Sequence, residues 1–466
     1  MRAPKSEFVV STEEECLTAV EGTDDRRTVS RATRRFLDVL RGLAPSVMCT
    51  SGGVFNPYGR VYRDTGGHVE LAAIESACPY FLAEVTHRQH ELVRRAVTIM
   101  AGEGCVFVLA NNNHSGLLES GTGVWGAHEN YLVSEHPKTF ADRILPFLVS
   151  RVYGGAGGID ARGTYLAAVR PQFMELSVGG STTERRAIHS TSREEHHMGG
   201  RDGSFRYHLI LGDGHRSRFN LALQFGATAL ALKAVLFDTQ LQRELERYHE
   251  PLFGNSWVKT IRELHVLARP GEEPRVHPFA LELQRLYLAG ARRYAESLGD
   301  DTPRWIPRLL VDWEQTLGAF ELCDRGWLAA RLDAFAKYEI CSELLAATGC
   351  HWGELPGRKE VCYELALLQQ NYHEFCNPQS VFSRAEDAGL LQHVVGESVT
   401  PGAEDEPYVP ETPTRAQARA RFIVENAGSP LVMDWSRVHD LPRRSRRLLS
   451  EPFARNYDPW TPSRVF

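Results

Sequence analysis

The stretch SGTGVWGAHENYLV, residues 120–133, decides how the fold must be arranged. A glycine-rich turn runs into an apolar strand that begins with His128, Glu129, Asn130 and Tyr131. Because a strand places alternate side chains on opposite faces, His128 and Asn130 point one way and Glu129 and Tyr131 the other. Such a strand either starts at the surface or lines a polar site with one of its faces. The rest of the chain must decide between these interpretations.

The composition is that of a globular protein with a large core. Of the 466 residues, 42% are hydrophobic and 24% charged, and 53 basic against 59 acidic side chains give a net charge of −6. The negative balance argues against a general nucleic-acid binder. The cysteines form no C-x-x-C pair and no long apolar segment opens the chain, which predicts a reduced, cytoplasmic protein. The chain contains no run of about eighteen uninterrupted apolar residues, so we expect no membrane span.

The pattern along the chain predicts an α+β fold. Short β-like runs and helical patterns at 31–43 and 82–100 fill residues 1–230, and residues from about 227 onward are helical. The β-like runs are EFVV, RVYRD, CVFVLAN, ENYLV and RYHLILGD. We predict a catalytic domain over 1–395, sheet-rich over 1–230 and helical over 231–395. An acidic, Pro- and Gly-rich linker over 396–413 and a small C-terminal domain over 414–466 follow, and the arginines of LPRRSRRLL (441–449) would form a solvated helix face.

Polar residues gather in several of these runs. Arg206 and His208 share one strand face, and carboxylates follow or precede other strands. Carboxylate and imidazole groups on one sheet could hold Mg²⁺, and arginines beside the ion could neutralise charge during phosphoryl transfer. No G-x-x-x-x-G-K-[ST] motif is present, so a nucleotide site would not be a P-loop. Each cluster also has a structural interpretation, such as a solvated strand edge at Glu7 or a hairpin turn at Asp64.

The ordered set of motifs resembles one family, the ligase and depupylase (deamidase) enzymes of the prokaryotic ubiquitin-like protein Pup. The resemblance rests on GRVYRD, HVE, HENYL, ILPFLVSR, YHLILGD and TRAQARARF, which occur in this order through nearly the whole chain. It implies a catalytic sheet similar to that of glutamine synthetase, an antiparallel or mixed sheet that binds ATP and Mg²⁺ on its concave face.

The resemblance also implies a role for each polar residue. Asp64 matches the central catalytic aspartate of the family. The implied metal ligands are Glu7, Glu70, Glu75, His128 and His208, and the implied ATP-binding residues are Asn130, Arg170, Arg186 and Arg206. The family begins with two acidic residues one apart in the pattern E-x-E-[FY]. We match this pattern to KSEF, which places Lys5 at the first acidic position, and we expect a divergent paralogue.

Several functions follow from the resemblance. The first is an ATP-dependent carboxylate–amine ligase that joins the C-terminal glutamate of Pup to a lysine through an acyl phosphate. The depupylases carry a long extra loop for which MCTSGGVFNPYG (48–59) leaves no room, and this favours the ligase. The alternatives are a depupylase-type amide hydrolase, a non-catalytic nucleotide- or Pup-binding regulator, and a small-molecule ligase. The expected partners are Pup or Pup-modified proteins, without nucleic acid or membrane.

Overall fold

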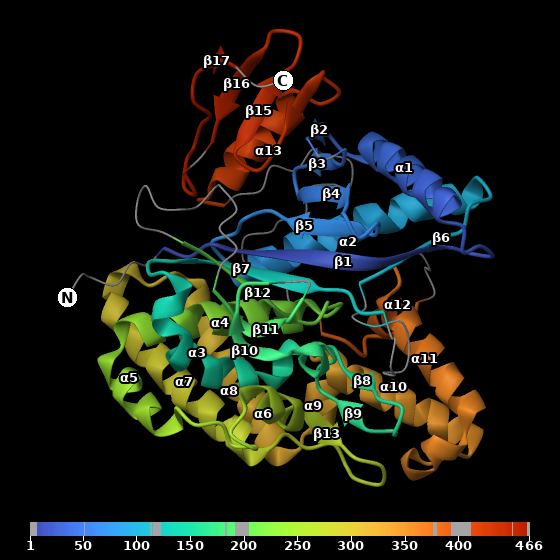
Figure 1. The fold of residues 1–466 in the computed structure, drawn as a ribbon, viewed down its shortest axis with the longest axis vertical. Helices are drawn as coiled ribbons and strands as arrows, with labels where there is room; N and C mark the ends of the chain where they lie inside the picture. The colour runs from blue at the N-terminus through green and yellow to red at the C-terminus, as the bar shows by residue number, and fades with distance from the viewer. Residues whose placement is uncertain are drawn as a thin grey trace.

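The computed structural model describes residues 7–50, 52–111, 114, 123–181, 184–191, 205–375, 380–392, 412–449 and 451–463. It confirms the predicted α+β fold: one large sheet with helices packed around it (Figure 1). Its strands are β1 Val10–Val20, β2 Val47–Cys49, β3 Val54–Asn56, β4 Gly59–Arg63, β5 Val69–Ala73, β6 Phe107–Ala110, β7 Ala127–Val133, β12 Phe205–Gly212, β14 Leu431–Met433, β15 Arg437–Asp440, β16 Ser445–Leu448 and β17 Thr461–Pro462.

The long strand β1 is the centre of the sheet. The strand order in the described residues is β12-β7-β1-β5-β4-β3-β2-β14-β15-β16-β17, with β6 paired to the end of β1. β1 pairs antiparallel with β5 and with β7, which sets Glu15 opposite Glu70 and Glu13 opposite His128. β12 pairs antiparallel with β7. This register brings polar residues that are distant in the sequence into neighbouring positions on one face of the sheet.

Three helices cover the other face: α1 (Arg26–Leu43), α2 (Pro79–Gly102) and α4 (Arg218–Phe237). The helix expected over 31–43 begins earlier, because the Asp25 side chain caps it by accepting hydrogen bonds from the backbone N–H groups of Arg27 and Thr28. The helix expected over 82–100 begins at Pro79, a residue that suits the first helical position. Both helices bury apolar faces against the sheet.

Helix α4 is apolar enough to meet the length and hydropathy criteria for a membrane span, with a mean hydropathy of 1.4. The apolar run of α4 is interrupted by Asn220, Gln224, Thr228 and Lys233, so it is not the uninterrupted stretch that predicts a membrane span from sequence. In the structure 94% of this window is buried inside the protein. Its residues pack in the main hydrophobic core with Tyr131, Tyr207 and Leu209 of the sheet, so α4 is a core helix.

A helical layer lies below the sheet in Figure 1; it includes α3 (Ala141–Ser150), which comes from the region predicted to be sheet-rich, and helices from residue 239 onward. The latter are α5 Thr239–Leu245, α6 Trp257–Leu264, α7 Pro278–Leu298, α8 Trp305–Leu322, α9 Arg325–Ala329, α10 Asp333–Thr348, α11 Lys359–His373 and α12 Val381–Asp387. Two small sheets adjoin this layer: β8 (Gly158–Ile159) with β9 (Tyr165–Leu166) and β13 (Val266–Ala268), and β10 (Leu176–Gly179) with β11 (Ala187–Ser190). The second of them connects the layer to β12 through β11.

The C-terminal part continues the main sheet, because β14 pairs parallel with β2. Helix α13 (Arg415–Glu425) packs beside these strands (Figure 1). The expected helix face in LPRRSRRLL is wrong: the segment is the turn and second strand of a β15–β16 hairpin. Strand pairing overrides the local pattern there, and the side chain of Asp440 accepts a hydrogen bond from the Arg443 N–H in the turn. The predicted linker lies outside the described residues apart from 412–413.

A buried ion pair holds strand β7 from behind. Glu129 accepts two hydrogen bonds from Arg151, at 2.6 Å from Nη2 and 2.7 Å from Nη1, and both side chains are about fully buried. Arg151 also donates to the hydroxyl of Thr228 on α4. Since this pair occupies the back of β7, the alternate residues His128 and Asn130 must face the opposite side.

We expect Arg151→Met to lower the free energy of unfolding by about 3–5 kcal/mol, because the Glu129 carboxylate would stay buried without its partner. The double variant Arg151→Met/Glu129→Gln should lose less free energy of unfolding than Arg151→Met alone, because it contains no unpaired buried charge. Urea-induced unfolding measures both. An Arg151→Met protein as stable as the parent would contradict this role for the pair.

Candidate active site

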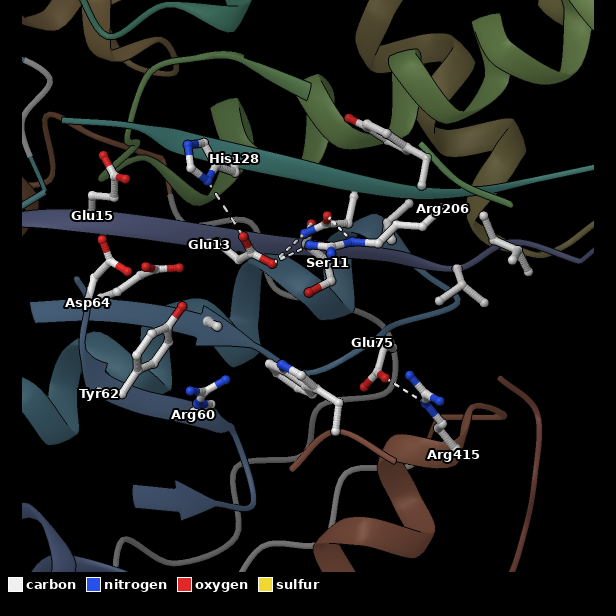
Figure 2. Close-up of a pocket in the computed structure, with 18 of the residues that line it drawn as sticks. Ser11, Glu13, Glu15, Arg60, Tyr62, Asp64, Glu75, His128, Arg206 and Arg415 are labelled. Atoms are coloured by element: carbon white, nitrogen blue, oxygen red, sulfur yellow. Dashed lines mark hydrogen bonds and ion pairs between the residues drawn. The ribbon is translucent and has the colours of Figure 1, made fainter. Parts of the chain in front are cut away.

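The front face of the sheet carries a cavity of about 410 Å³, lined by β1, β4, β5, β7, β12 and the C-terminal part. Figure 2 shows Glu15 and Asp64 at one end, Glu13 and Arg206 in the middle, and Glu75 with Arg415 at the other end. All of these residues line the cavity. The polar start of the HENY strand therefore faces a site: His128 and Asn130 line the cavity from β7.

The first polar group centres on Glu13. Arg206 Nη2 donates to Glu13 Oε1 at 2.6 Å, and Arg206 Nε donates to Asn130 Oδ1 at 2.8 Å. His128 Nδ1 lies 3.5 Å from Glu13 Oε2, too far for a good hydrogen bond. Burial would raise the pKa of Glu13, but Arg206 holds it well below its ordinary value and His128 and His208 add to the effect. Glu13 is therefore charged at neutral pH.

The second group consists of Glu15, Asp64 and His68. His68 Nε2 lies 3.8 Å from Glu15 Oε1 and 3.6 Å from Asp64 Oδ2. Asp64 ends β4 at a turn in which the Gly66 N–H donates to its carboxylate at 3.2 Å. Burial would raise the pKa of Glu15, but His68, His128 and Arg170 together lower it below the ordinary value. The Asp64 side chain is 27% exposed, so a substrate can reach it from solvent.

Glu70 connects the two groups from β5. It lies opposite Glu15 on β1 and opposite Tyr62 on β4. Burial raises the pKa of Glu70 to about 8, and the charges of Glu13, Asp64 and Glu15 contribute. Burial and neighbouring carboxylates both disfavour the ionised form of Glu70, so its carboxyl group keeps its proton to a higher pH.

These residues fit divalent cations. The ligand atoms of Glu13, His128 and His208 lie within 4.8 Å of one another, and so do those of Glu15, Asp64 and His68. His68 Nε2 and His128 Nδ1 are buried and have no hydrogen-bond partner among the described residues, so a ligand position stands open at each. Carboxylate oxygens suit Mg²⁺, and imidazole adds a nitrogen ligand. The second group offers two carboxylates and one imidazole and the first offers one carboxylate and two imidazoles, so water or phosphate oxygens would fill the remaining positions at each.

Two predicted metal ligands lie elsewhere. Glu7 precedes β1 with an exposed side chain, and it is not among the residues that line the cavity. Glu75 lines the cavity, but its two oxygens accept hydrogen bonds of 2.7–2.9 Å from Arg415 and Arg419 of α13. Burial would raise the pKa of Glu75, and the two arginines lower it. Glu75 thus fastens α13 to the sheet, whereas Glu70, His128 and His208 do lie at the two groups.

The four predicted ATP-binding residues fall into two sets. Asn130 and Arg206 contact each other and Glu13 in the middle of the cavity. Arg170 is buried, and the Asp213 carboxylate orients its backbone by accepting a hydrogen bond from the Arg170 N–H at 3.1 Å. Burial lowers the pKa of Arg170 to about 10, and the nearby charge of Arg186 lowers it too. Buried nitrogens of Arg170 and Arg186 have no hydrogen-bond partner in the described part of the chain, which suits an anion.

The sequence interpretation missed Glu13 and Glu15. The structure shows two acidic residues one apart on a central strand, in the segment TEEEC rather than in KSEF. Lys5 lies outside the described residues. The alternation of side chains along a strand could have revealed them, because Glu13 and Glu15 share one face of the strand. Glu14 lies on the opposite face, where its Oε2 is 2.6 Å from Nε2 of His90 on α2.

Comparisons with known proteins show the family and the fold of the chain. A family model described as Pup-ligase protein matches residues 5–439. The chain belongs to the Pup-ligase protein family. Two curated relatives are the Pup–protein ligase of Acidimicrobium ferrooxidans, 29% identical over 87% of each chain, and that of Corynebacterium diphtheriae, 28% identical over 88% of this chain and 85% of the relative.

Two solved structures share the fold of this family member. One is the Pup ligase PafA in complex with Pup, with a TM-score of 0.73 and 21% identity over 97% of this chain and 90% of that chain. The other is PafA in complex with ADP, with a TM-score of 0.68 and 21% identity over 94% and 93% of the two chains. The likeness spans the sheet, the helical layer and the C-terminal part.

We expect Glu13→Gln to weaken Mg²⁺ binding by at least about tenfold, because it removes an anionic ligand of the first group. Glu7→Gln is the matched control and should leave Mg²⁺ affinity unchanged, since Glu7 does not line the cavity. Titration calorimetry with Mg²⁺ measures both affinities. The opposite result, with Glu7→Gln impaired and Glu13→Gln normal, would show that the acidic pair had been assigned to the wrong segment.

The raised pKa of Glu70 predicts that Mg²⁺ stabilises this protein more as pH rises. The folded state binds more protons than the unfolded state between the ordinary pKa of 4.5 and about 8, so without Mg²⁺ stability is lost as pH rises through about 8. Mg²⁺ supplies the positive charge that the proton gives at low pH. The rise in Tm caused by Mg²⁺ should therefore grow between about pH 5 and pH 8. Glu70→Gln should make the Mg²⁺-induced rise in Tm less dependent on pH. A rise in Tm that is the same at every pH in the parent would contradict this prediction.

Proposed function

We propose that this protein is an ATP- and Mg²⁺-dependent ligase that joins the C-terminal glutamate of Pup to a lysine of another protein. The observation that carries the proposal is the single cavity that combines two carboxylate–imidazole groups, the guanidinium of Arg206 and the accessible carboxylate of Asp64. Phosphoryl transfer needs the cations and the arginine, and amide formation needs a base. Membership of the Pup-ligase family gives the substrate class.

The polar and the apolar side chains that line the cavity give ATP its orientation. The triphosphate belongs beside Glu13 and Glu15, where cations would offset its charge, with Asn130 and Arg206 in the same part of the cavity and the charges of Arg170 and Arg186 nearby. The apolar lining residues are Val9, Val10, Leu132 and Trp435. Arg419 lies 4.8 Å from the Trp435 ring and also binds Glu75, which joins this part of the lining to the sheet. An aromatic and aliphatic surface suits the purine base.

The chemistry proceeds in two steps. An oxygen of the glutamate carboxylate attacks the γ-phosphorus of ATP, the bond from phosphorus to the β-phosphate oxygen breaks, and ADP leaves. The resulting acyl phosphate is electrophilic because phosphate is a good leaving group. The lysine amine attacks its carbonyl carbon, phosphate leaves, and an amide remains. Mg²⁺ bound by the two groups would supply Lewis-acid stabilisation of the phosphate oxygens.

Asp64 takes the proton that the amine loses. Its carboxylate lies at the cavity mouth, is partly exposed and is oriented by the turn at Gly66. A lysine side chain arriving from solvent therefore meets Asp64, the most exposed member of the second group, before it meets Glu13 and His128 of the first group. Proton transfer to a positioned carboxylate makes the amine nucleophilic as it attacks.

The strand connections support the ligase over the hydrolase. Strands β2, β3 and β4 follow one another as antiparallel hairpins, and β3 and β4 are joined by Pro57 and Tyr58 alone. This compact meander holds no extra loop of the depupylase kind. We place the reaction in the cytoplasm, which agrees with the free thiols at all eight described cysteines.

We expect the purified protein, with ATP, Mg²⁺, Pup ending in glutamate and a lysine-bearing protein, to give a covalent adduct and ADP. Intact mass spectrometry reads the adduct. Asp64→Asn should lower the rate of adduct formation by at least about a hundredfold, because the base is lost while the fold stays intact. Loss of adduct from a preformed conjugate, without net ATP use, would identify the hydrolase. Nucleotide binding with neither reaction would identify a regulator or a small-molecule ligase.

A further inference from the structure

Helix α1 presents a row of arginines to solvent next to the turn that carries Asp64. Arg27, Arg31 and Arg34 are exposed and spaced i, i+4 and i+7, so they lie on one face of the helix, and Arg41 continues the row. We call these four residues the arginine stripe. Figure 1 shows α1 on the outside of the molecule beside β2, β3 and β4.

Local structure explains only part of the stripe: Arg31 donates a hydrogen bond to Thr28 Oγ1 at 3.3 Å, and Arg41 lies in the last turn, where positive charge stabilises a helix. Arg26 and Arg27 occupy the first turn, where positive charge opposes the helix dipole. Within the described residues, Arg35 is the one α1 arginine that forms an ion pair, with Glu103. The neighbouring Asp25 serves as the helix cap. In a chain of net charge −6, the arginines of α1 form a local positive surface, which the exposed Asp38 interrupts between Arg34 and Arg41, and Arg27 and Arg34 have no ion pair within the described residues that explains them.

Arg63 connects the beginning of the stripe to the catalytic turn. Its Nη1 donates to Ser30 Oγ on α1 at 3.0 Å, and its Nε donates to the Gly67 carbonyl at 3.2 Å. Asp64 is the next residue in the chain and begins that turn. A protein whose lysine reaches Asp64 at the cavity mouth therefore lies close to the first turns of α1.

We propose that the arginine stripe is a docking surface for an acidic stretch of the lysine-bearing substrate protein. The inference rests on the proposed function and deepens it by naming a preference among acceptors. Arginines repel a surface rich in lysine and attract glutamate and aspartate, so the stripe selects a lysine whose neighbours are acidic. Exposed charges of this kind act mainly on encounter rates and weaken as salt is added.

The test compares acceptors in the full-length protein with ATP, Mg²⁺ and Pup. One acceptor is a peptide with one lysine among glutamates, and the second is the same peptide with glutamines in place of the glutamates. The third is N-acetyl-lysine, acetylated on its α-amine, so that the side-chain amine is free. We expect kcat/KM for the acidic peptide to exceed that for the neutral one by about tenfold at low salt. The difference should vanish at about 0.5 M salt, where charges are screened within a few ångströms.

The variant Arg27→Gln/Arg31→Gln/Arg34→Gln should lose this preference and keep the parent rate with N-acetyl-lysine, and the corresponding triple change to lysine should retain the preference. The matched control is Arg243→Gln/Arg247→Gln/Arg304→Gln, three exposed arginines of the helical layer, which should behave as the parent.

A glutamine variant that keeps the preference, or a parent that has none while it still modifies N-acetyl-lysine, would overturn the inference and leave the ligase intact. A parent that modifies no acceptor would overturn both. Loss of binding to a DNA oligonucleotide in the variant, with an unchanged acceptor preference, would assign the stripe to nucleic acid and also overturn the inference.

Discussion

Strand β1 alternates its side chains between the cavity and the core, and the site depends on that alternation. Glu13 and Glu15 face the cavity, whereas Glu14 faces the opposite side and contacts His90 and Asn111. A shift of one residue would turn Glu14 into the cavity and remove the other two. The pairs on both sides of β1, with Glu70 on β5 and His128 on β7, hold the register from two directions.

The resulting cavity places more negative charge in a buried space than its own cations offset. Arg206 compensates Glu13, but Glu15, Asp64 and Glu70 converge beside it, and the pKa of Glu70 is raised by its burial and further by the neighbouring carboxylate charges. Divalent ions and a nucleotide together would balance this charge, because the ions neutralise the carboxylates and also attract the phosphates. The concentration of carboxylates that is costly without cations therefore makes the cavity suited to phosphoryl transfer.

Local patterns in the sequence predicted part of this arrangement. The two faces of HENY followed from the strand period, and the structure places His128 and Asn130 on the cavity side as that period requires. Strand β1 was missed, because three successive glutamates hide its alternation and the partner of Glu14 is a histidine on a helix far along the chain. The role of Glu75 also depends on partners that are distant in the sequence. Its partners Arg415 and Arg419 lie in the C-terminal part, and no local spacing could show that they occupy both of its oxygens.

We expect the cavity face of β1 to hold two divalent ions, and diffraction at the manganese absorption edge tests this directly. Crystals of the protein grown with Mn²⁺ should give two anomalous peaks. One should lie among Glu13, His128 and His208, and the other among Glu15, Asp64 and His68. A peak beside Glu7, or a cavity without any ordered ion, would contradict the account.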